Sequence, residues 1–296
     1  MNTAYVNPDT GIREVQDVLL EILTDVGACC EKHGLRYTLY CGTLLGAIRH
    51  GGFIPWDDDV DIAMPLADYD RFFTIAQEEL REKYVIQTFE NTRQHPWIWM
   101  RVYRKGTTYL RRKCAVMEID HGIALDIYPF VGIPDKALPR LLQKLALRLA
   151  YALQYVELWR ATDFYSRRRH IRILGRCISL LPYALRRRLN RFLCRHALKD
   201  PGRYARTCTL DAAPFVPKYA TADWKEMTTH EFEGRLFPIP VKYDLLLRTM
   251  YGDYMLLPPV EDRHGHTDFY GGVIADPHRD YREYQKKLLA ERAAGA

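Results

Sequence analysis

The stretch WDDDVDIAM, residues 56–64, places four aspartates among residues that have to be buried. Alternate side chains of a β-strand share a face, so the pattern predicts Asp57, Asp59 and Asp61 on one face and Val60 turned toward the core. Carboxylates at this spacing stand about 6–7 Å apart and raise one another's pKa. A shared cation would neutralise them, and oxygen ligands of this kind suit Mg²⁺ or Mn²⁺.

The acidic run admits two other interpretations. The first is a solvated acidic turn before a strand, which the apolar neighbours of the aspartates disfavour. Asp58 fits this interpretation better than the others, because it falls on the second face of the strand and nearer the turn. The second is an EF-hand calcium loop. That loop requires Gly at its sixth position and Glu at its twelfth, where this chain has Ile62 and Asp68, so we exclude it.

A further acid lies on an apolar stretch, GIALDIYPF at residues 122–130. Burying the Asp126 carboxylate is costly unless it is paired or bound to a metal. We therefore expect Asp126 to be a third metal ligand or a general base, with a strand-end aspartate that caps a turn as the alternative.

A glycine-threonine pair precedes the aspartates by about fifteen residues. Gly42 and Thr43 stand where a strand gives way to a helix, and a helix N-terminus with free N–H groups binds phosphate. Arg49 and His50 end the same helix and add positive charge. A phosphate-binding helix terminus on one side of a site and paired carboxylates on the other indicate metal-assisted phosphoryl transfer.

Apolar periodicity predicts alternating helices and strands in the first 130 residues, which favours a mixed α/β sheet domain. A glycine stop at Gly34 ends the first helix. The expected helices cover residues 12–33, 67–80 and about 241–251; the expected strands cover 36–40, 59–64, 84–89, 97–103 and 122–128; and a helical region covers 137–197.

The charge is unevenly distributed. Residues 136–206 hold 18 Lys and Arg against three acids, a net charge of +15, so the rest of the chain is near −9 although the whole carries +6. The part over 167–199 pairs arginine clusters with apolar residues, which indicates contact with an anionic membrane surface. A solvated helical subdomain and nucleic-acid binding are the alternatives, and no nucleic-acid motif supports the last.

Neither a secretory signal nor a membrane-spanning stretch is expected from the sequence. The seven cysteines include no CxxC pair, which is typical of a reducing compartment. We therefore expect a cytoplasmic protein, with the basic segment at the inner face of the cytoplasmic membrane.

Three motifs together resemble the LicD family of bacterial phosphocholine transferases, which is related to fukutin and fukutin-related protein within the nucleotidyltransferase superfamily. They are GTLLGAIRHGGFIPWDDDVDIAM at 42–64, GIALDIYPF at 122–130 and YGDYMLLPP at 251–259. The resemblance implies an α/β (α+β) fold: a polymerase-β-like nucleotidyltransferase core with a mixed sheet over 1–135, an inserted basic helical region over 136–206, and a C-terminal part over 207–296 packed on the core.

The resemblance also implies an activity. A phospho-alcohol, with phosphocholine foremost, would pass from a CDP-alcohol such as CDP-choline to a sugar hydroxyl of a cell-surface glycan or its lipid-linked precursor, with release of CMP. The implied metal ligands are Asp57, Asp59, Asp61 and Asp126, of which the last three are catalytic. The implied substrate contacts are Gly42, Thr43, Arg49, His50, Arg101, Lys105 and Trp56, and Trp56 could form a choline cage with Trp97 and Trp99.

Two rival functions stay open at this point: an Asp-x-Asp sugar-nucleotide glycosyltransferase, and a non-catalytic basic protein that binds membrane or RNA. Three histidines near the end, His264, His266 and His278, form only a weak zinc pattern, and we expect them at the surface or along the substrate. The motifs do not choose the alcohol, the acceptor glycan, the number of metal ions or the oligomeric state.

Overall fold

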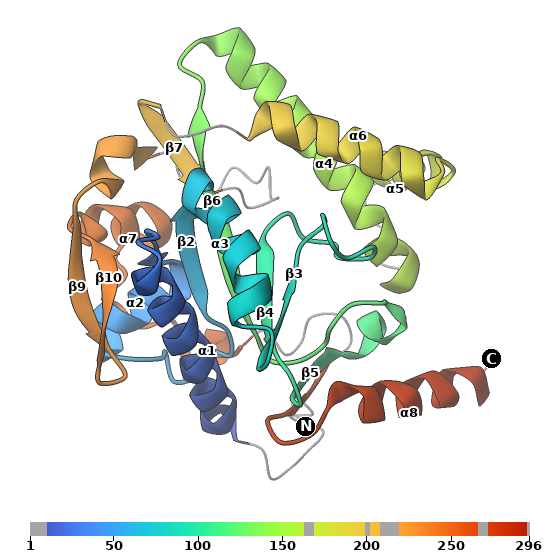
Figure 1. The fold of residues 1–296 in the computed structure, drawn as a ribbon, viewed down its shortest axis with the longest axis horizontal. Coiled ribbons are helices and arrows are strands. Elements are labelled where there is room, and N and C mark those ends of the chain that lie inside the picture. Colours follow the sequence, from blue (N-terminus) through green and yellow to red (C-terminus); the bar gives the residue numbers. More distant parts are fainter. Residues whose placement is uncertain (1–10, 163–168, 199–201, 208–218, 266–271, 295–296) are drawn as a thin grey trace.

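Strand β6 (Ala124–Ile133) is the centre of the main sheet, because β2, β4 and β7 all pair with it. The computed structural model describes residues 11–162, 169–198, 202–207, 219–265 and 272–294. The sheet has the order β1-β2-β6-β4-β3, with β7 and β8 added along the end of β6 (Figure 1). Besides β6 its strands are β1 (Thr38–Leu39), β2 (Asp61–Pro65), β3 (Tyr84–Gln87), β4 (Met100–Arg104), β7 (Tyr204–Thr207) and β8 (Tyr219–Ala220).

The sheet is mixed, as expected: β2 runs parallel to β6, and the other pairings are antiparallel. Two strand pairs lie outside it. They are β5 (Thr108–Arg111) with β11 (Val273–Asp276), and β9 (Met227–Phe232) with β10 (Arg235–Pro240). The helices are α1 (Ile12–Lys32), α2 (Cys41–His50), α3 (Leu66–Glu79), α4 (Ala137–Thr162), α5 (Arg169–Ser179), α6 (Tyr183–Ala197), α7 (Tyr243–Tyr251) and α8 (Tyr281–Ala294).

One face of the sheet carries the main hydrophobic core. Ile62 of β2, Val102 of β4 and Ile127 of β6 are fully buried there, together with the apolar stripe of α1 and with Phe72 of α3. Figure 1 shows α1 and α3 side by side over this face. Since strand side chains alternate, residues 61, 101 and 126 must point to the opposite face.

The predicted elements are present, with shifted boundaries. Helix α1 ends before Gly34, whose φ of +59° suits glycine, as expected. Strand β2 begins at Asp61 instead of residue 59, because the preceding aspartates lie in a loop. Strand β4 begins at Met100, and β6 continues beyond residue 128 to Ile133.

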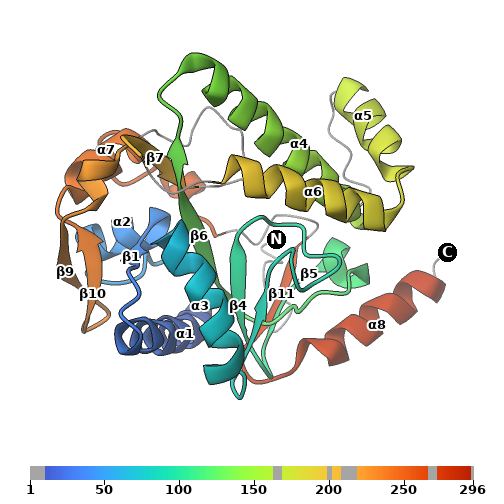
Figure 2. The ribbon, with the colours of Figure 1, turned by 45° about the horizontal axis from the view of Figure 1, so that its top comes forward.

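The helical pattern predicted for 137–197 is confirmed as α4, α5 and α6. Figure 2 shows α4 and α6 running side by side above the sheet. Strand β7 begins inside the stretch 136–206 and pairs with β6, so the end of that stretch belongs to the main sheet. Among the residues that the structure describes, no helix is both long and apolar enough to cross a bilayer.

The hairpin of β9 and β10 holds the chain that follows α2. Glu233, at the hairpin turn, accepts hydrogen bonds from the backbone N–H of Phe53 (2.9 Å) and from Arg13 of α1 (2.8 Å). A Cβ on Gly52 would come within 2.2 Å of the Glu233 carboxylate, so only glycine allows this approach. The C-terminal part therefore fixes the loop that leads to the aspartates.

Buried amides hold the helical region to the sheet. Gln154 of α4 donates hydrogen bonds to the carbonyls of His95 (2.9 Å) and Trp97 (2.6 Å), in the segment that leads into β4. Asn190 of α6 donates to the carbonyl of Ala150 at 2.8 Å.

We expect Gln154→Leu to lower the free energy of unfolding by about 1–3 kcal/mol, because two buried carbonyls lose their donor. Urea denaturation measures the change. The matched control is Gln77→Leu on α3, where the exposed amide donates only to its own helix, so the change should stay within about 0.5 kcal/mol. Equal losses for the two variants would mean that the amide does not hold α4.

Candidate active site

Three charged side chains stand in a row on the face opposite the core. Asp61 of β2 is in register with Asp126 of β6, and Arg101 of β4 is in register with Asp126 on the other side. Neighbouring strands lie about 4.8 Å apart, so the sheet itself sets the spacing of this row. Asp61 and Asp126 are buried.

Asp61 is surrounded by like charge. Burial raises its pKa well above the ordinary value, and the carboxylates of Asp59, Asp126 and Asp57 raise it further, while Arg101 opposes them. Its Oδ1 atom is buried and has no hydrogen-bond partner in the described residues. A buried, unpartnered carboxylate oxygen among three other carboxylates is an environment that a cation would stabilise.

Asp126 is held by a bidentate ion pair. Arg101 donates from Nε to Oδ1 at 2.5 Å and from Nη2 to Oδ2 at 2.9 Å. The guanidinium also lies over the Trp97 ring, 4.0 Å from its centroid. The structure thus brings Arg101 to the acids, as a partner of Asp126.

The first turn of α2 lies against the same group. A Cβ on Gly42 would come within 2.7 Å of Asp57 Oδ2, so glycine allows that carboxylate to approach the helix N-terminus. Thr43 Oγ1 accepts a hydrogen bond from the backbone N–H of Asp61 at 2.8 Å. Gly42 and Thr43 therefore position the helix and the aspartates relative to each other.

Asp58 is separate from this group. Tyr109 of β5 donates its hydroxyl proton to Asp58 Oδ2 at 2.7 Å, and Gly265 packs directly over the Asp58 carboxylate. A small cavity of about 30 Å³ begins here, and Asp59 and Arg101 also line it. It lies along one side of the acidic group.

Several residues near the acids were not predicted from the sequence. Tyr128 follows Asp126 by two positions on the same face, and burial and the charges of Asp61 and Asp126 raise its pKa. The strand period of two is the signal that would have found it. The pKa of Tyr251 at the end of α7 is also raised, by desolvation of its hydroxyl and then by Cys41 and Asp61, although the residue as a whole is 43% exposed. No local pattern links α7 to β2, so Tyr251 could not be found in this way.

Other expected substrate contacts lie beside the site instead of at the acids. Arg49 donates from Nη1 to the carbonyl of Tyr254 at 2.8 Å, which ties α2 to the loop after α7. The rings of His50 and Trp56 are 6.4 Å apart, and the Arg263 guanidinium lies 5.5 Å from the Trp56 centroid.

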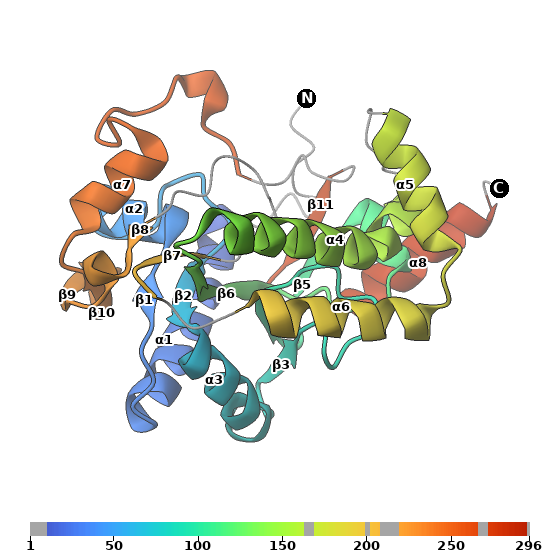
Figure 3. The same cartoon turned by 90° about the horizontal axis from the view of Figure 1, so that it is seen from above.

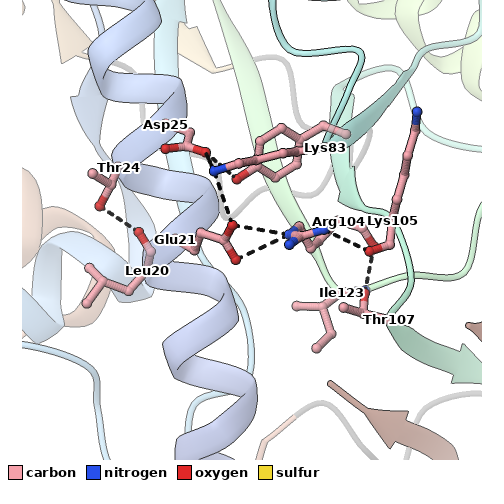
Figure 4. A network of polar contacts seen from close by, with 10 residues as sticks. Leu20, Glu21, Thr24, Asp25, Lys83, Arg104, Lys105, Thr107 and Ile123 are labelled. Atoms are coloured by element: carbon pink, nitrogen blue, oxygen red, sulfur yellow. Dashed lines mark hydrogen bonds and ion pairs between the residues drawn. The ribbon is translucent and has the colours of Figure 1, made fainter. Parts of the chain in front are cut away.

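Lys105 is far from the aspartates. It follows β4 at the end away from Arg101, and its Nζ donates to the carbonyl of Arg81 at 2.5 Å. Figure 4 shows it beside a polar network formed by α1, the residue before β3 and the end of β4, in which Lys83 Nζ lies 3.0 Å from Asp25 Oδ2.

The expected tryptophan cage is only partly assembled. Trp97 and Trp99 have ring centroids 6.2 Å apart, and Trp99 lies 5.1 Å from Tyr128, but Trp56 packs elsewhere with His50. One face of Trp97 is covered by Arg101.

The histidines near the C-terminus do not form a metal group in the described part of the chain. His264 contacts the carbonyl of Gly265, His278 follows β11, and His266 lies outside the described residues.

One group within the described ranges brings three ligand atoms within 4.8 Å of one another: Cys29, His33 and Glu79. It lies on α1 and α3, which cover the core face. Glu79 already accepts hydrogen bonds from His33 Nε2 (2.6 Å) and Lys32 Nζ (2.9 Å). The site aspartates do not meet this distance criterion among the described residues.

We expect Thr43→Val to lower the free energy of unfolding by about 1–3 kcal/mol, because it leaves the buried N–H of Asp61 without an acceptor. Thr43→Ser keeps the oxygen and should retain most of the stability. Chemical denaturation of the two variants checks this, and a Ser variant as unstable as the Val variant would contradict it.

Comparisons with known proteins show which family this chain belongs to. A family model described as LicD/FKTN/FKRP, nucleotidyltransferase domain, matches residues 34–139. The chain is 30% identical over 262 residues to the lipopolysaccharide cholinephosphotransferase LicD of Haemophilus influenzae, covering 86% of this chain and 95% of that protein. It is 58% identical over 128 residues to the mouse ribitol 5-phosphate transferase FKRP, covering 36% of this chain and 26% of that protein. The chain therefore belongs to the LicD family and is a LicD-type phosphotransferase.

Proposed function

We propose that this enzyme transfers a phospho-alcohol from a CDP-alcohol to a sugar hydroxyl of a cell-surface glycan or its lipid-linked precursor, and that CMP leaves. The observation that carries the proposal is the unpartnered Asp61 Oδ1 atom, buried among Asp57, Asp59 and Asp126 beside the N-terminus of α2. A phosphoryl donor and its cation complement that arrangement of charge.

The cation of this proposal is Mg²⁺ or Mn²⁺. Asp59 and Asp61 would hold it, with Asp57 and Asp126 as further ligands, and the donor set consists of oxygens that such ions prefer. When bound, the ion would neutralise phosphate charge and polarise the phosphorus centre. Asp61 Oδ1 has no competing partner, so the residues present fit the ion.

The protein groups have separate roles in this proposal. The first turn of α2, with Gly42 and Thr43, directs free backbone N–H groups at the phosphates. Both Asp126 oxygens accept hydrogen bonds from Arg101, which favours a role in holding charge over uptake of a proton. Asp59 lines the cavity, and in this proposal its carboxylate would take the proton of the acceptor hydroxyl.

The alcohol is proposed from the relatives and from the aromatic residues. One relative is named for cholinephosphate transfer and another for ribitol 5-phosphate transfer, so both move a phospho-alcohol. Trp97, Trp99 and Tyr128 form an aromatic surface beside Asp126, and aromatic faces attract quaternary ammonium groups. We therefore propose phosphocholine first.

Family membership argues against both rivals, the sugar-nucleotide glycosyltransferase and the non-catalytic binding protein. The six cysteines among the described residues are all free, which supports the expected cytoplasmic location. The polymerase-β-like assignment of the core is part of the same proposal, supported by the mixed sheet with its acids on β2 and β6.

A donor assay tests the reaction. Purified enzyme is given CDP-choline, CDP-ribitol, CDP-glycerol or CDP-ethanolamine, and release of CMP is measured with Mg²⁺ and then with EDTA. We expect CMP from one donor, none with EDTA, and a loss of at least about 100-fold for Asp59→Ala, as for other lost electrostatic contacts to a transferring group. The control Glu78→Ala removes an exposed acid of α3 and should leave the rate unchanged. Turnover of sugar nucleotides in place of CDP-alcohols would overturn the proposal.

The stability of Asp61→Asn tests the cation. The folded-state pKa of Asp61 lies above its ordinary value of 3.8, so the metal-free fold loses stability as pH rises from that value toward the folded pKa. At neutral pH we expect metal-free Asp61→Asn to be more stable than wild type. Mg²⁺ should stabilise wild type, by about 2.7 kcal/mol at a hundredfold excess over Kd, and should leave the variant unchanged.

The control for this measurement is Asp120→Asn. Burial raises the pKa of Asp120 to about 6, and its charged neighbours do not include the site aspartates. This variant should also gain stability at neutral pH but keep its response to Mg²⁺. Equal stabilisation of Asp61→Asn and wild type by Mg²⁺ would show that Asp61 is not a ligand.

A further inference from the structure

The first half of α4 presents a stripe of leucines to solvent. The side chains lie within an arc of about 100° around the helix and extend over about 17 Å of its length. Figure 3, seen from above, shows α4 in front of the sheet. We call this surface the α4 leucine face; it consists of Leu138, Leu141, Leu142, Leu145 and Leu149, which are 66%, 52%, 57%, 50% and 39% exposed.

The opposite side of α4 is fixed, so the stripe cannot turn inward. Gln143, Leu147 and Ala150 are buried. The Gln143 side chain donates from Nε2 to the carbonyl of Gly132 at 2.7 Å and to the carbonyl of Ala197 at 2.8 Å. These bonds tie α4 to the end of β6 and to the end of α6.

Positive charge accompanies the leucines. Lys136, Arg140, Lys144 and Arg148 are all exposed, and no Asp or Glu occurs between residues 136 and 156. At 100° per residue, Lys144 and Arg148 follow one edge of the leucine stripe. An apolar face bordered by cations on one helix is the pattern of a helix that lies in the surface of an anionic bilayer.

We infer that the α4 leucine face binds an anionic membrane surface, with the leucines in the acyl boundary and the lysines and arginines at the headgroups. The helix is not apolar enough to span the bilayer, so it would lie parallel to it. A second copy of the chain is a poorer occupant, because its cationic edge would meet the same charge. A protein partner is also disfavoured, because binding hot spots are rich in Trp and Tyr and this face has leucine alone.

The position of α4 connects this surface to the reaction. Helix α4 follows directly from β6, which carries Asp126, and the strand spans about 23 Å from Asp126 to Ile133. Membrane binding would hold the aspartates of the site at a set distance from the bilayer. A lipid-linked acceptor lies at that bilayer. This last step rests on the proposed function, whereas the membrane contact itself does not.

Vesicle co-sedimentation tests the inference. The full chain is mixed with vesicles of phosphatidylcholine, with or without phosphatidylglycerol, at low and at high salt. We expect binding to the anionic vesicles that weakens at high salt. The double variants Leu141→Gln/Leu145→Gln and Lys144→Gln/Arg148→Gln should each weaken binding by about tenfold or more. The first loses apolar contact with the membrane and the second loses charge beside it. Gln retains helix propensity, so α4 should persist in both variants.

The control is Leu236→Gln on β10, a leucine 67% exposed and far from α4 in the fold, which should bind as wild type does. Light scattering after size-exclusion chromatography runs beside the assay. Absence of binding to anionic vesicles, or a dimer that the leucine variant converts to a monomer, would overturn the inference. Without vesicles, the α4 variants should release CMP in a metal-dependent reaction at the rate of the wild type. A failure of the proposed function would appear in this assay, whereas a failure of the membrane inference would appear only in the vesicle assay.

Discussion

Repulsion between carboxylates on adjacent parallel strands is the constraint on which the rest of this structure depends. The register of β2 with β6 sets Asp61 beside Asp126, and the loop before β2 adds Asp57 and Asp59. Arg101 compensates one of these charges through a buried bidentate pair. Asp61 is left with an oxygen that no described group satisfies, and the proposed phosphoryl transfer rests on this unmet charge.

The surrounding elements serve to hold that arrangement. Thr43 ties the backbone of Asp61 to α2, and Gly42 lets the Asp57 carboxylate approach the helix. The C-terminal part completes the site from outside the region that the family model matches: Glu233 fixes the loop after α2, Gly265 covers Asp58, and Tyr251 approaches the acids. The site is thus built from segments far apart in the sequence.

Local patterns were enough to predict much of this from the sequence. The alternation of the aspartates separates Asp58 from Asp61, and Val60 between them is buried in the core as expected. The helices followed from their periodicity, and the mixed sheet from the alternation of elements. The pairing of β5 with β11 could not be predicted, because partner choice between distant short strands depends on tertiary packing. The position of Lys105 also depends on tertiary structure: it follows β4 at the end away from Arg101, and its Nζ donates to the carbonyl of Arg81.

Diffraction from crystals grown with Mn²⁺ and CDP, with anomalous scattering recorded for manganese, tests the central claim most directly. The account predicts manganese peaks bound by Asp61 and Asp59, with the diphosphate of CDP between them and the first turn of α2. A peak at Cys29, His33 and Glu79 with nothing at Asp61 would contradict it, and so would CDP bound away from the aspartates.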